Sequence, residues 1–327
     1  MSILVSVNCM AYNHEPYIGD AIEGFLKQKT NFDIEILIGE DCSTDNTRKI
    51  VEEYAEKFPD KIKMITSEKN VGWKENDRRL LENSKGKYIA VCEGDDYWID
   101  PYKLQKQLDY MESHPECTLC FHASQIVDSN GRLQKGKFRP YLKNTISKTE
   151  DIIEGGGEFC PTASLFFSKD LLDKIPDFVL NAHVGDYPLQ MWLSSIGYAY
   201  YLDDFMSIYR MGAAGSWTVQ QNSGNDRVKK IVDTKIADID LLNKFNEYSN
   251  FKYEKSIEKT IMKREFEILL AQNRIKEIKS SKYKVFFEGM DHAQIIKVYT
   301  KYFFPKIYSK LVLFKSKISN HAGKLKW

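Results

Sequence analysis

Carboxylate side chains follow two largely apolar segments in the first third of this 327-residue sequence. The segment Glu93–Asp96 (EGDD) comes directly after the run 87–92, and Glu40–Asp41 follows the run 34–39. Neighbouring carboxylates supply the hard oxygen ligands that bind a divalent cation, together with the hydroxyls or phosphates that it bridges. Because acidic pairs also occur in ordinary solvated turns, either segment alone indicates a metal site only moderately.

Two further positions carry side chains that suit substrate binding or proton transfer. Tyr12–Asn13 ends the first apolar segment, where an aromatic ring either stacks on a nucleotide base or belongs to the core. Gly185–Asp186 precedes an amphipathic segment, where a carboxylate is more often a helix cap than a base. The sequence has none of the motifs GxGxxG after a strand, GxxxxGK[ST], GxSxG or HExxH, so the acidic residues are its main chemical signal.

The elements that must position these residues alternate along the first half of the sequence. Apolar segments predict strands, and segments with apolar residues at helical spacing separate most of them. The predicted strands are 3–7, 34–39, 61–66, 87–92 and 118–127. This alternation predicts an α/β fold with a mostly parallel sheet, in which ligands bind beyond the carboxyl ends of the strands. We therefore expect the acidic residues to share one crevice.

A change of composition marks the predicted domain boundary. Residues 211–227 are rich in Gly, Ser and Asn and lack apolar periodicity, whereas the pattern beyond them is helical to the end. We predict a domain of residues 1–220 and a helical, basic region of residues 221–327.

Charge is distributed unevenly. Residues 1–250 carry a net charge of −10 and residues 251–327 one of +11. An acidic body argues against nucleic acid as a partner, because duplex binding needs a cationic surface. Residues 292–327 hold eight Lys, no Asp or Glu, and an apolar helical face, a pattern that suits an interfacial helix on an anionic bilayer. A helix packed on the body is nearly as well supported, and an oligomerisation helix is the third alternative.

The remaining composition predicts a cytoplasmic protein, with the inner face of the cell membrane as a peripheral location. The six cysteines are scattered, the N-terminus has no signal-peptide pattern, and no window holds 18 consecutive apolar residues. Cys117 and Cys120 form a lone CxxC within a predicted strand, which predicts small core side chains in preference to a zinc or redox site.

Five motifs, in this order and spacing, resemble the family 2 glycosyltransferases, which are inverting enzymes of the GT-A fold. The motifs are VSVNCMAYN (5–13), IGEDCSTD (38–45), NVG (70–72), GKYIAVCEGDDYW (86–98) and VGD (184–186). The resemblance covers about residues 1–217. The version with GDDYW followed by DPYKLQKQ is similar to bacterial enzymes that build surface polysaccharides.

On the donor side, the resemblance implies a nucleotide-sugar site. Tyr12, next to Asn13, would stack near the base, and Asp41 would hydrogen-bond uracil, which suggests a UDP-sugar. Asn76 or Arg78 would also touch the nucleotide.

Around the reacting atoms, the resemblance implies a metal and a general base. Asp95 would contact the ribose or the metal-bound diphosphate, and Asp96 would ligate Mn²⁺ or Mg²⁺. Asp186 would be the general base. The loop Gly155–Thr162 would border the acceptor through Gly157 and Thr162. Trp217 is grouped with these acceptor-side residues, and it would either lie on a mobile loop that closes over the donor or be a packing residue.

One departure from the family pattern affects the metal site. Relatives often have a metal-binding or diphosphate-binding His where this sequence has Gly212, so either His183 or Arg210 compensates or metal binding is weaker. We predict a metal-dependent inverting glycosyltransferase that uses a glycan or lipid-linked acceptor. The alternative is a non-catalytic GT-A-like module that binds nucleotide sugars and recruits partners. A nucleotidyltransferase is disfavoured, because residues 11–14 supply no Gly-rich phosphate loop.

Overall fold

The computed structural model describes residues 3–224 and 226–304. The chain divides into two compact units, one of residues 1–223 and 243–257 and the other of residues 224–242 and 258–327. Helices α9 (Arg227–Tyr248) and α10 (Glu254–Ala271) each contribute residues to both units. The predicted boundary between residues 220 and 221 stays a prediction. Most of the predicted basic tail, residues 305–327, lies outside the described residues.

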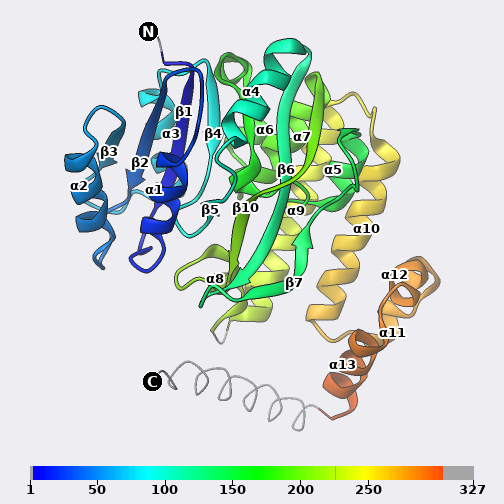
Figure 1. Cartoon of the computed structure of the whole chain (residues 1–327). Coiled ribbons are helices and arrows are strands. Elements are labelled where there is room, and N and C mark those ends of the chain that lie inside the picture. Colours follow the sequence, from blue (N-terminus) through cyan, green and yellow to red (C-terminus); the bar gives the residue numbers. More distant parts are fainter. Residues whose placement is uncertain (1–2, 225, 305–327) are drawn as a thin grey trace. The chain divides into compact units, whose positions relative to one another are not determined.

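The larger unit is built on one sheet (Figure 1). Its strand order is β3-β2-β1-β4-β9-β6-β10-β5, with β7 paired to β6 and β8 to β10. The strands are β1 (Val5–Ala11), β2 (Ile34–Glu40), β3 (Ile62–Thr66), β4 (Tyr88–Val91), β5 (Tyr97–Trp98), β6 (Cys117–Asp128), β7 (Leu133–Phe138), β8 (Thr145–Ser147), β9 (Phe166–Ser168) and β10 (Tyr198–Met211). The pairs β1–β2, β2–β3, β1–β4 and β6–β10 are parallel, and the short strand β9 is antiparallel to both β4 and β6. The predicted α/β fold with a mostly parallel central sheet is confirmed.

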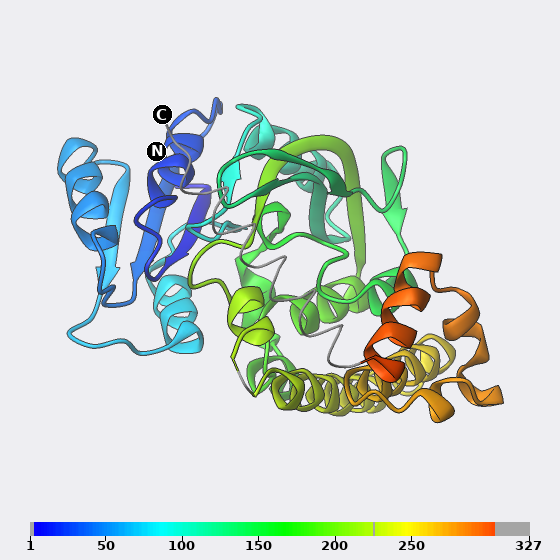
Figure 2. The ribbon, with the colours of Figure 1, turned by 90° about the horizontal axis from the view of Figure 1, so that it is seen from below.

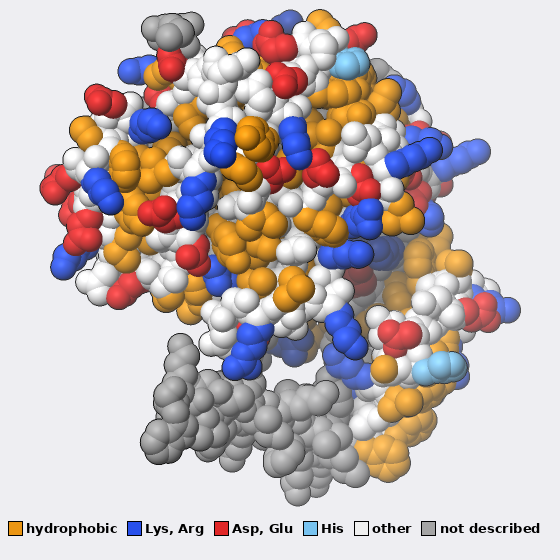
Figure 3. All heavy atoms as spheres, viewed as in Figure 1, with side chains coloured by type: hydrophobic (Ala, Val, Ile, Leu, Met, Phe, Trp, Pro, Cys, Tyr) orange, Lys and Arg blue, Asp and Glu red, His pale blue; other side chains and the backbone are white. Residues whose placement is uncertain are grey.

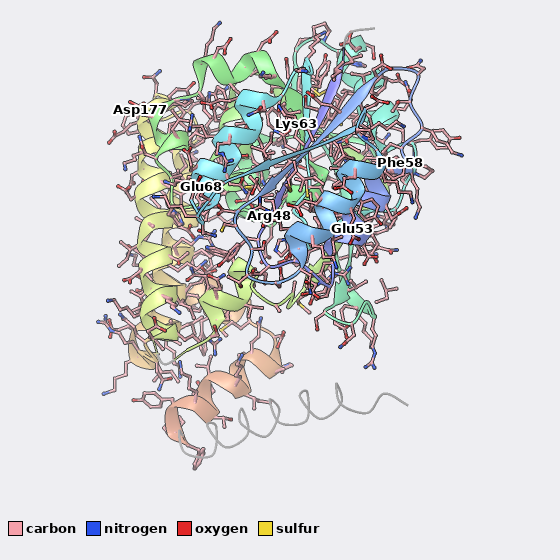
Figure 4. All side chains as sticks on the ribbon, turned by 90° about the vertical axis from the view of Figure 1, so that its left-hand side faces the viewer. Arg48, Glu53, Phe58, Lys63, Glu68 and Asp177 are labelled. Atoms are coloured by element: carbon pink, nitrogen blue, oxygen red, sulfur yellow. The ribbon has the colours of Figure 1, made fainter. Side chains whose placement is uncertain are left out.

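Helices cover both faces of the sheet. Helices α1 (Ile18–Leu26) and α2 (Thr47–Lys57) lie on one face, and α3 (Trp73–Asn83) lies on the other (Figure 2). Figure 4 views the edge of the sheet, with Arg48 and Glu53 on α2 and Lys63 on the edge strand β3. The other helices of this unit include α4 (Lys103–Ser113), α5 (Thr149–Gly155), α6 (Asp177–Leu180), α7 (Asp186–Ile196) and α8 (Trp217–Asn222).

The alternation of side chains along the strands explains this layering. On β1, Val5, Val7 and Cys9 are fully buried in one cluster with α1 residues, while Leu37 of β2 packs with Leu80 of α3 on the opposite face. Successive strand residues point to opposite faces, so strands covered on both sides must be apolar throughout. Cys117 and Cys120 are buried free thiols, as the core interpretation of the CxxC predicts.

Several elements extend beyond the predicted pattern or were not predicted at all. β10 continues from Tyr198 to Met211, because register shifts at two irregularities between Leu202 and Ser207 carry it past the charged residues Asp203 and Asp204. β7 has four exposed residues among its six and therefore no apolar alternation to detect. Helix α3 was also not predicted, because it starts directly after a glycine and has a low apolar content.

The smaller unit is helical, as predicted for this part of the sequence. Besides its parts of α9 and α10, it contains α11 (Ile275–Ile278), α12 (Lys284–Glu288) and α13 (His292–Phe303). Its core includes Phe266, Leu269, Ile275, Ile278 and Tyr283. None of the helices in the described ranges is long and apolar enough to cross a bilayer.

Candidate active site

The carboxyl ends of three neighbouring strands bring the predicted site residues together. The N–H of Gly94, after β4, donates to the carbonyl oxygen of Met10 on β1 at 2.9 Å. The N–H of Asp41, after β2, donates to the carbonyl oxygen of Ala11 at 3.0 Å. The segments 12–13, 40–41 and 93–96 therefore meet at one edge of the sheet, as the strand pattern predicts.

Asp41 holds the turn that leads into α3. Its side chain is buried, and its two carboxylate oxygens accept the backbone N–H groups of Val71 at 2.7 Å and Gly72 at 3.0 Å. Gly72 has φ +82°, a conformation that glycine adopts without the steric cost of a side chain. A carboxylate has about four lone-pair sites, so Asp41 keeps acceptor capacity for a ligand.

At the end of β1, the backbone presents Tyr12 to solvent. The Tyr12 side chain is 36% exposed, and the next residue, Asn13, has φ +56°. The Asn13 Oδ1 accepts the N–H of Thr44 at 2.8 Å, and the Asn13 N–H donates to Ser43 Oγ at 3.0 Å. The side chain of Asn13 thus fixes the loop after β2, and the ring of Tyr12 stays exposed beside it.

Asp95 and Asp96 are held by the end of β10. Asp96 is 2% exposed, and its Oδ1 accepts the N–H of Arg210 at 2.8 Å. The guanidinium of Arg210 donates through Nε to the carbonyl oxygen of Asp95 at 3.0 Å and through Nη2 to Asp20 Oδ2 at 2.8 Å. On the other side of the loop, His14 Nε2 lies 4.0 Å from Asp95 Oδ1.

Arg210 is itself enclosed, so it does not replace the family histidine as a free cation. Its guanidinium carbon lies 4.7 Å from the ring centre of Tyr17 and 5.2 Å from that of Tyr97. Its guanidinium donates to the carbonyl oxygen of Asp95 and to the carboxylate of Asp20. Gly212, two residues on, has φ +80°.

The carboxylates at this acidic edge raise one another's pKa values. Burial, with the charges of Asp95 and Glu93, raises the pKa of Asp96 well above its usual range. Burial, with the charges of Asp95, Asp186 and Asp77, raises the pKa of Glu93 to about 8. Among the described residues, no three His, Cys, Asp or Glu side chains form a complete metal cage. The oxygen donors fit Mn²⁺ or Mg²⁺ bound by one or two carboxylates and completed by substrate phosphates.

Asp186 joins this edge from a distant part of the sequence. It is the first residue of α7, and a Cβ built on Gly157 would lie 3.3 Å from its Oδ2. Its charge contributes to the raised pKa of Glu93. Gln190, one turn further along α7, donates to the Cys160 carbonyl oxygen at 2.9 Å and so fixes the loop that contains Gly157. The predicted base and the predicted acceptor loop are therefore neighbours.

The other two predicted acceptor-side residues each begin a short helix. Thr162 begins the 3₁₀ turn Thr162–Ser164, which follows the loop at Gly157. Trp217 begins α8 and is 49% exposed. A Cβ built on Gly215 would lie 3.9 Å from the Asn13 carbonyl oxygen, so the segment before Trp217 approaches the end of β1.

The structure gives Asn76 and Arg78 local partners in place of a ligand-facing position. Asn76 is 2% exposed and donates to the Gly39 carbonyl oxygen at 2.7 Å, beneath β2. Arg78 is an exposed side chain that pairs with Glu75 and Glu82 on its own helix. At 100° per residue, Arg78 lies about 200° around α3 from Asn76, so the two cannot share a role. Our proposal for the donor site therefore leaves both out.

Trp73 lies beside the predicted site residues, and sequence reasoning did not single it out. It begins α3 directly after the turn held by Asp41, and it is 39% exposed. A Cβ built on Gly185 would lie 3.0 Å from its ring, next to Asp186. The ring therefore connects the turn at Asp41 to the start of α7. The only sequence signal was an aromatic residue directly after the NVG turn.

A central, mostly parallel sheet with an acidic carboxyl edge and a second carboxylate opposite it defines a GT-A-type α/β protein. The sequence matches the family described as "Glycosyl transferase family 2" over residues 6–175, which is more than half of the chain. The chain belongs to this family. The predicted resemblance is thereby confirmed.

Several curated proteins are similar to this chain. It is 34% identical over 213 residues to the uncharacterized protein Rv1520 of Mycobacterium tuberculosis, a match that covers 65% of this chain and 60% of that protein. The chain thus spans about 60% of the length of this relative. It is 32% identical to the Escherichia coli glucosyltransferase WfgD, named for transfer from UDP-Glc to GlcNAc-diphosphoundecaprenol, over 58% of this chain and 69% of WfgD.

Solved structures share the fold at low sequence identity. TarS of Staphylococcus aureus in complex with UDP-GlcNAc has a TM-score of 0.56 and 18% identity, covering 83% of this chain and 80% of that one. The mannosyltransferase PcManGT of Pyrobaculum calidifontis, in complex with GDP-Man and Mn²⁺, has a TM-score of 0.55 and 13% identity, covering 94% and 88%. At these identities the likeness shows the fold alone.

Proposed function

We propose that this chain is an inverting, metal-dependent glycosyltransferase that moves a sugar from a nucleotide donor to a hydroxyl of a surface glycan or of its lipid-linked precursor. The observation that carries the proposal is the run of carboxylates Glu93, Asp95 and Asp96 after β4, with Asp186, at the start of α7, near enough for its charge to raise the pKa of Glu93. Family membership supports the reaction class. The names of WfgD and of the Bacillus subtilis teichuronic acid glycosyltransferase TuaG support a surface or lipid-linked acceptor.

The proposed donor site lies along the ends of β1, β2 and β4. The exposed ring of Tyr12 stacks near the base, and the spare lone pairs of Asp41 accept from uracil. UDP is the favoured nucleotide, because two TarS structures hold UDP or UDP-GlcNAc. GDP is the next candidate, since PcManGT holds GDP-Man.

The proposed proton acceptor is Asp186. A well-placed carboxylate removes the acceptor hydroxyl's proton as the oxygen attacks the anomeric carbon, which contributes about 10²–10⁴-fold to the rate. Attack from the face opposite the departing diphosphate inverts the configuration, so no second enzymatic nucleophile is needed. Asp95 and Asp96 would hold Mn²⁺ or Mg²⁺, which when bound offsets the charge that develops on the leaving diphosphate.

The test of the donor site is calorimetric titration of UDP into the full chain, with and without Mn²⁺. We expect binding that depends on Mn²⁺ and is lost in Asp96→Ala. The matched control is Asp20→Ala, which also removes a carboxylate near Arg210 but not a proposed metal ligand. Failure of UDP, GDP and dTDP to bind under any metal condition would contradict the proposal.

The non-catalytic alternative rests on Gly212, which stands where relatives often have histidine. Asp186→Asn separates the two functions, since a binding module has no turnover to lose. Donor hydrolysis or transfer that disappears in Asp186→Asn while UDP still binds supports the enzyme. Wild-type protein that binds UDP-sugars but turns over none of them, with any acceptor tried, supports the module.

We also propose that residues 292–327 bind an anionic membrane surface and place the enzyme at the periphery of the cytoplasmic face. The support is compositional: eight Lys and no acidic residue. Deletion of 292–327 should weaken binding to phosphatidylglycerol vesicles, and unchanged binding would overturn this part of the proposal.

A further inference from the structure

A basic segment interrupts the acidic body of the larger unit. Residues 129–148 contain six Lys and Arg and no Asp or Glu, although residues 1–250 together carry a net charge of −10. The segment includes β7, which pairs with β6 at the margin of the sheet. Like-charged residues gathered in this way attract an anionic partner that the rest of the body repels.

One face of β7 is left to solvent. Leu133 is 66% exposed, and Lys135 and Lys137 are also exposed. The β6–β7 pairing is irregular between Leu133 and Lys137, but the three exposed residues still alternate with the part-buried Gln134 and Phe138 and so share one face. The opposite face is packed, since the ring of Phe138 lies 5.2 Å from that of Tyr209.

The charges on this segment are mostly uncompensated. Arg139 is paired with Asp203, with nitrogen–oxygen distances of 2.7 and 2.6 Å. In the part of the chain that the structure describes, Arg132 and Lys135 make no ion pair. Exposed cations without a carboxylate partner bind an anionic surface at a low free-energy cost, because no existing ion pair must break.

The exposed face lies beside the candidate active site. Asp96 accepts the N–H of Arg210 on β10, Arg210 pairs with Val127 on β6, and Val127 pairs with Leu133 on β7. At a strand spacing of about 5 Å, Leu133 lies about 10 Å from Arg210 across the sheet. Figure 3 shows Lys and Arg side chains at the lower margin of the larger unit, where Figure 1 draws β7 and α8.

We propose that this face of β7, with Arg132, contacts an anionic lipid bilayer and holds the donor site at the membrane surface. Cations beside an exposed apolar side chain fit a bilayer, where the cations bind headgroups and the apolar group enters the interface. A soluble polyanion would explain the lysines but not the exposed Leu133. This surface is separate from residues 292–327 and goes beyond the proposed transfer reaction.

The experiment measures binding of the full chain to phosphatidylcholine vesicles with and without phosphatidylglycerol. We expect Lys135→Glu/Lys137→Glu to weaken binding to the anionic vesicles by about tenfold or more, with the difference shrinking at high salt. The matched control is Lys57→Glu/Lys61→Glu, which makes the same charge change at exposed residues beyond the opposite end of the sheet. The control should bind like the wild type.

A second variant distinguishes a bilayer from a soluble polyanion. Leu133→Ser leaves every charge in place and should also weaken vesicle binding, while binding to dextran sulfate stays unchanged. Equal losses in the two lysine pairs, or no loss in Lys135→Glu/Lys137→Glu, would overturn the proposal. A wild-type protein that binds no vesicles would also overturn it. The same holds if Leu133→Ser binds vesicles normally while Lys135→Glu/Lys137→Glu loses its binding to dextran sulfate. UDP binding and thermal unfolding, which should match the wild type, verify that each variant is folded and keep this test independent of the proposed reaction.

Discussion

The two halves of the sheet's carboxyl edge are built in opposite ways. On the β1–β2–β4 side, Asp41 and Asp96 are buried, and each accepts backbone N–H groups that fix its carboxylate. On the β6–β7 side, Leu133 and Lys135 are exposed, and within the described part of the chain no side-chain hydrogen bond or ion pair fixes either of them. On the first side the polar groups are held in fixed positions. The second side is distinguished only by its basic and exposed apolar residues.

This difference fits the ligands that we propose for each side. A small charged ligand is recognised by a few polar groups at fixed positions, and their burial strengthens each interaction. A bilayer or another extended partner requires only apolar area and charge of the right sign, at no fixed geometry. Substitutions should therefore have large effects on the first side and graded effects on the second.

The largest expected effect is on turnover. Asp186→Asn removes the proton acceptor but keeps the shape of the side chain, so turnover should fall by about 10²–10⁴-fold. Steady-state kinetics and calorimetry on the same preparation check this, because UDP affinity should not change. Full activity in this variant would remove Asp186 from the mechanism.

A substitution of Asp41 should affect both stability and donor binding. Asp41→Ala leaves the N–H groups of Val71 and Gly72 without an acceptor, which should cost about 1–3 kcal/mol in the free energy of unfolding. UDP affinity should fall as well, because the turn before α3 loosens.

Urea unfolding and UDP titration measure the two effects of Asp41→Ala. Glu53→Ala, on the exposed face of α2, is the control and should change the free energy of unfolding by about 0.5 kcal/mol or less. Wild-type stability in Asp41→Ala would show that the turn does not depend on this carboxylate.

Two arginines provide a matched comparison between buried and exposed positions. Arg210 is a positioning residue, since it acts on Asp95 and Asp96 and has no assigned ligand contact. Arg210→Met should weaken Mn²⁺-dependent UDP binding several-fold and reduce stability, because a buried charge-assisted network is lost. Arg78→Met removes exposed pairs on one helix and should cost about 0.5 kcal/mol or less. Equal effects of the two substitutions, measured by calorimetry and urea unfolding, would contradict this distinction.

The smallest effect on function is expected at Lys103, which is fully buried behind the site. Its Nζ donates to Gln107 Oε1 at 2.7 Å, and burial lowers its pKa from 10.5 to about 7. Between about pH 7 and 10.5 the unfolded chain binds this proton and the folded chain does not, so stability should rise with pH in that window.

Lys103→Met should remove this rise without changing UDP affinity. Thermal unfolding at several pH values checks it, with Lys106→Met as the control. Lys106 lies three residues further along α4 and keeps its charge in a part-exposed pair with Asp100 and Asp204. If stability still rises with pH in Lys103→Met, another titrating group causes the rise.

The sequence alone determined the sheet and the acidic edge. Continuous apolar strands can be covered only by helices on both faces, and parallel strands place all their carboxyl ends at one edge. These two constraints are local in origin, which is why Asp41, Asp95 and Asp96 could be grouped before the structure was known. The family motifs then added Asp186.

Only the tertiary structure decided which polar groups face a ligand and which serve the fold. Asn76 and Arg210 resemble site residues in the sequence, but the first supports Gly39 and the second holds the Asp95–Asp96 loop. Trp73 and the exposed face of β7 have no periodic pattern at all, and their positions come from contacts with residues far away in the sequence. Such contacts depend on how the elements pack, and side-chain spacing along one segment does not encode them.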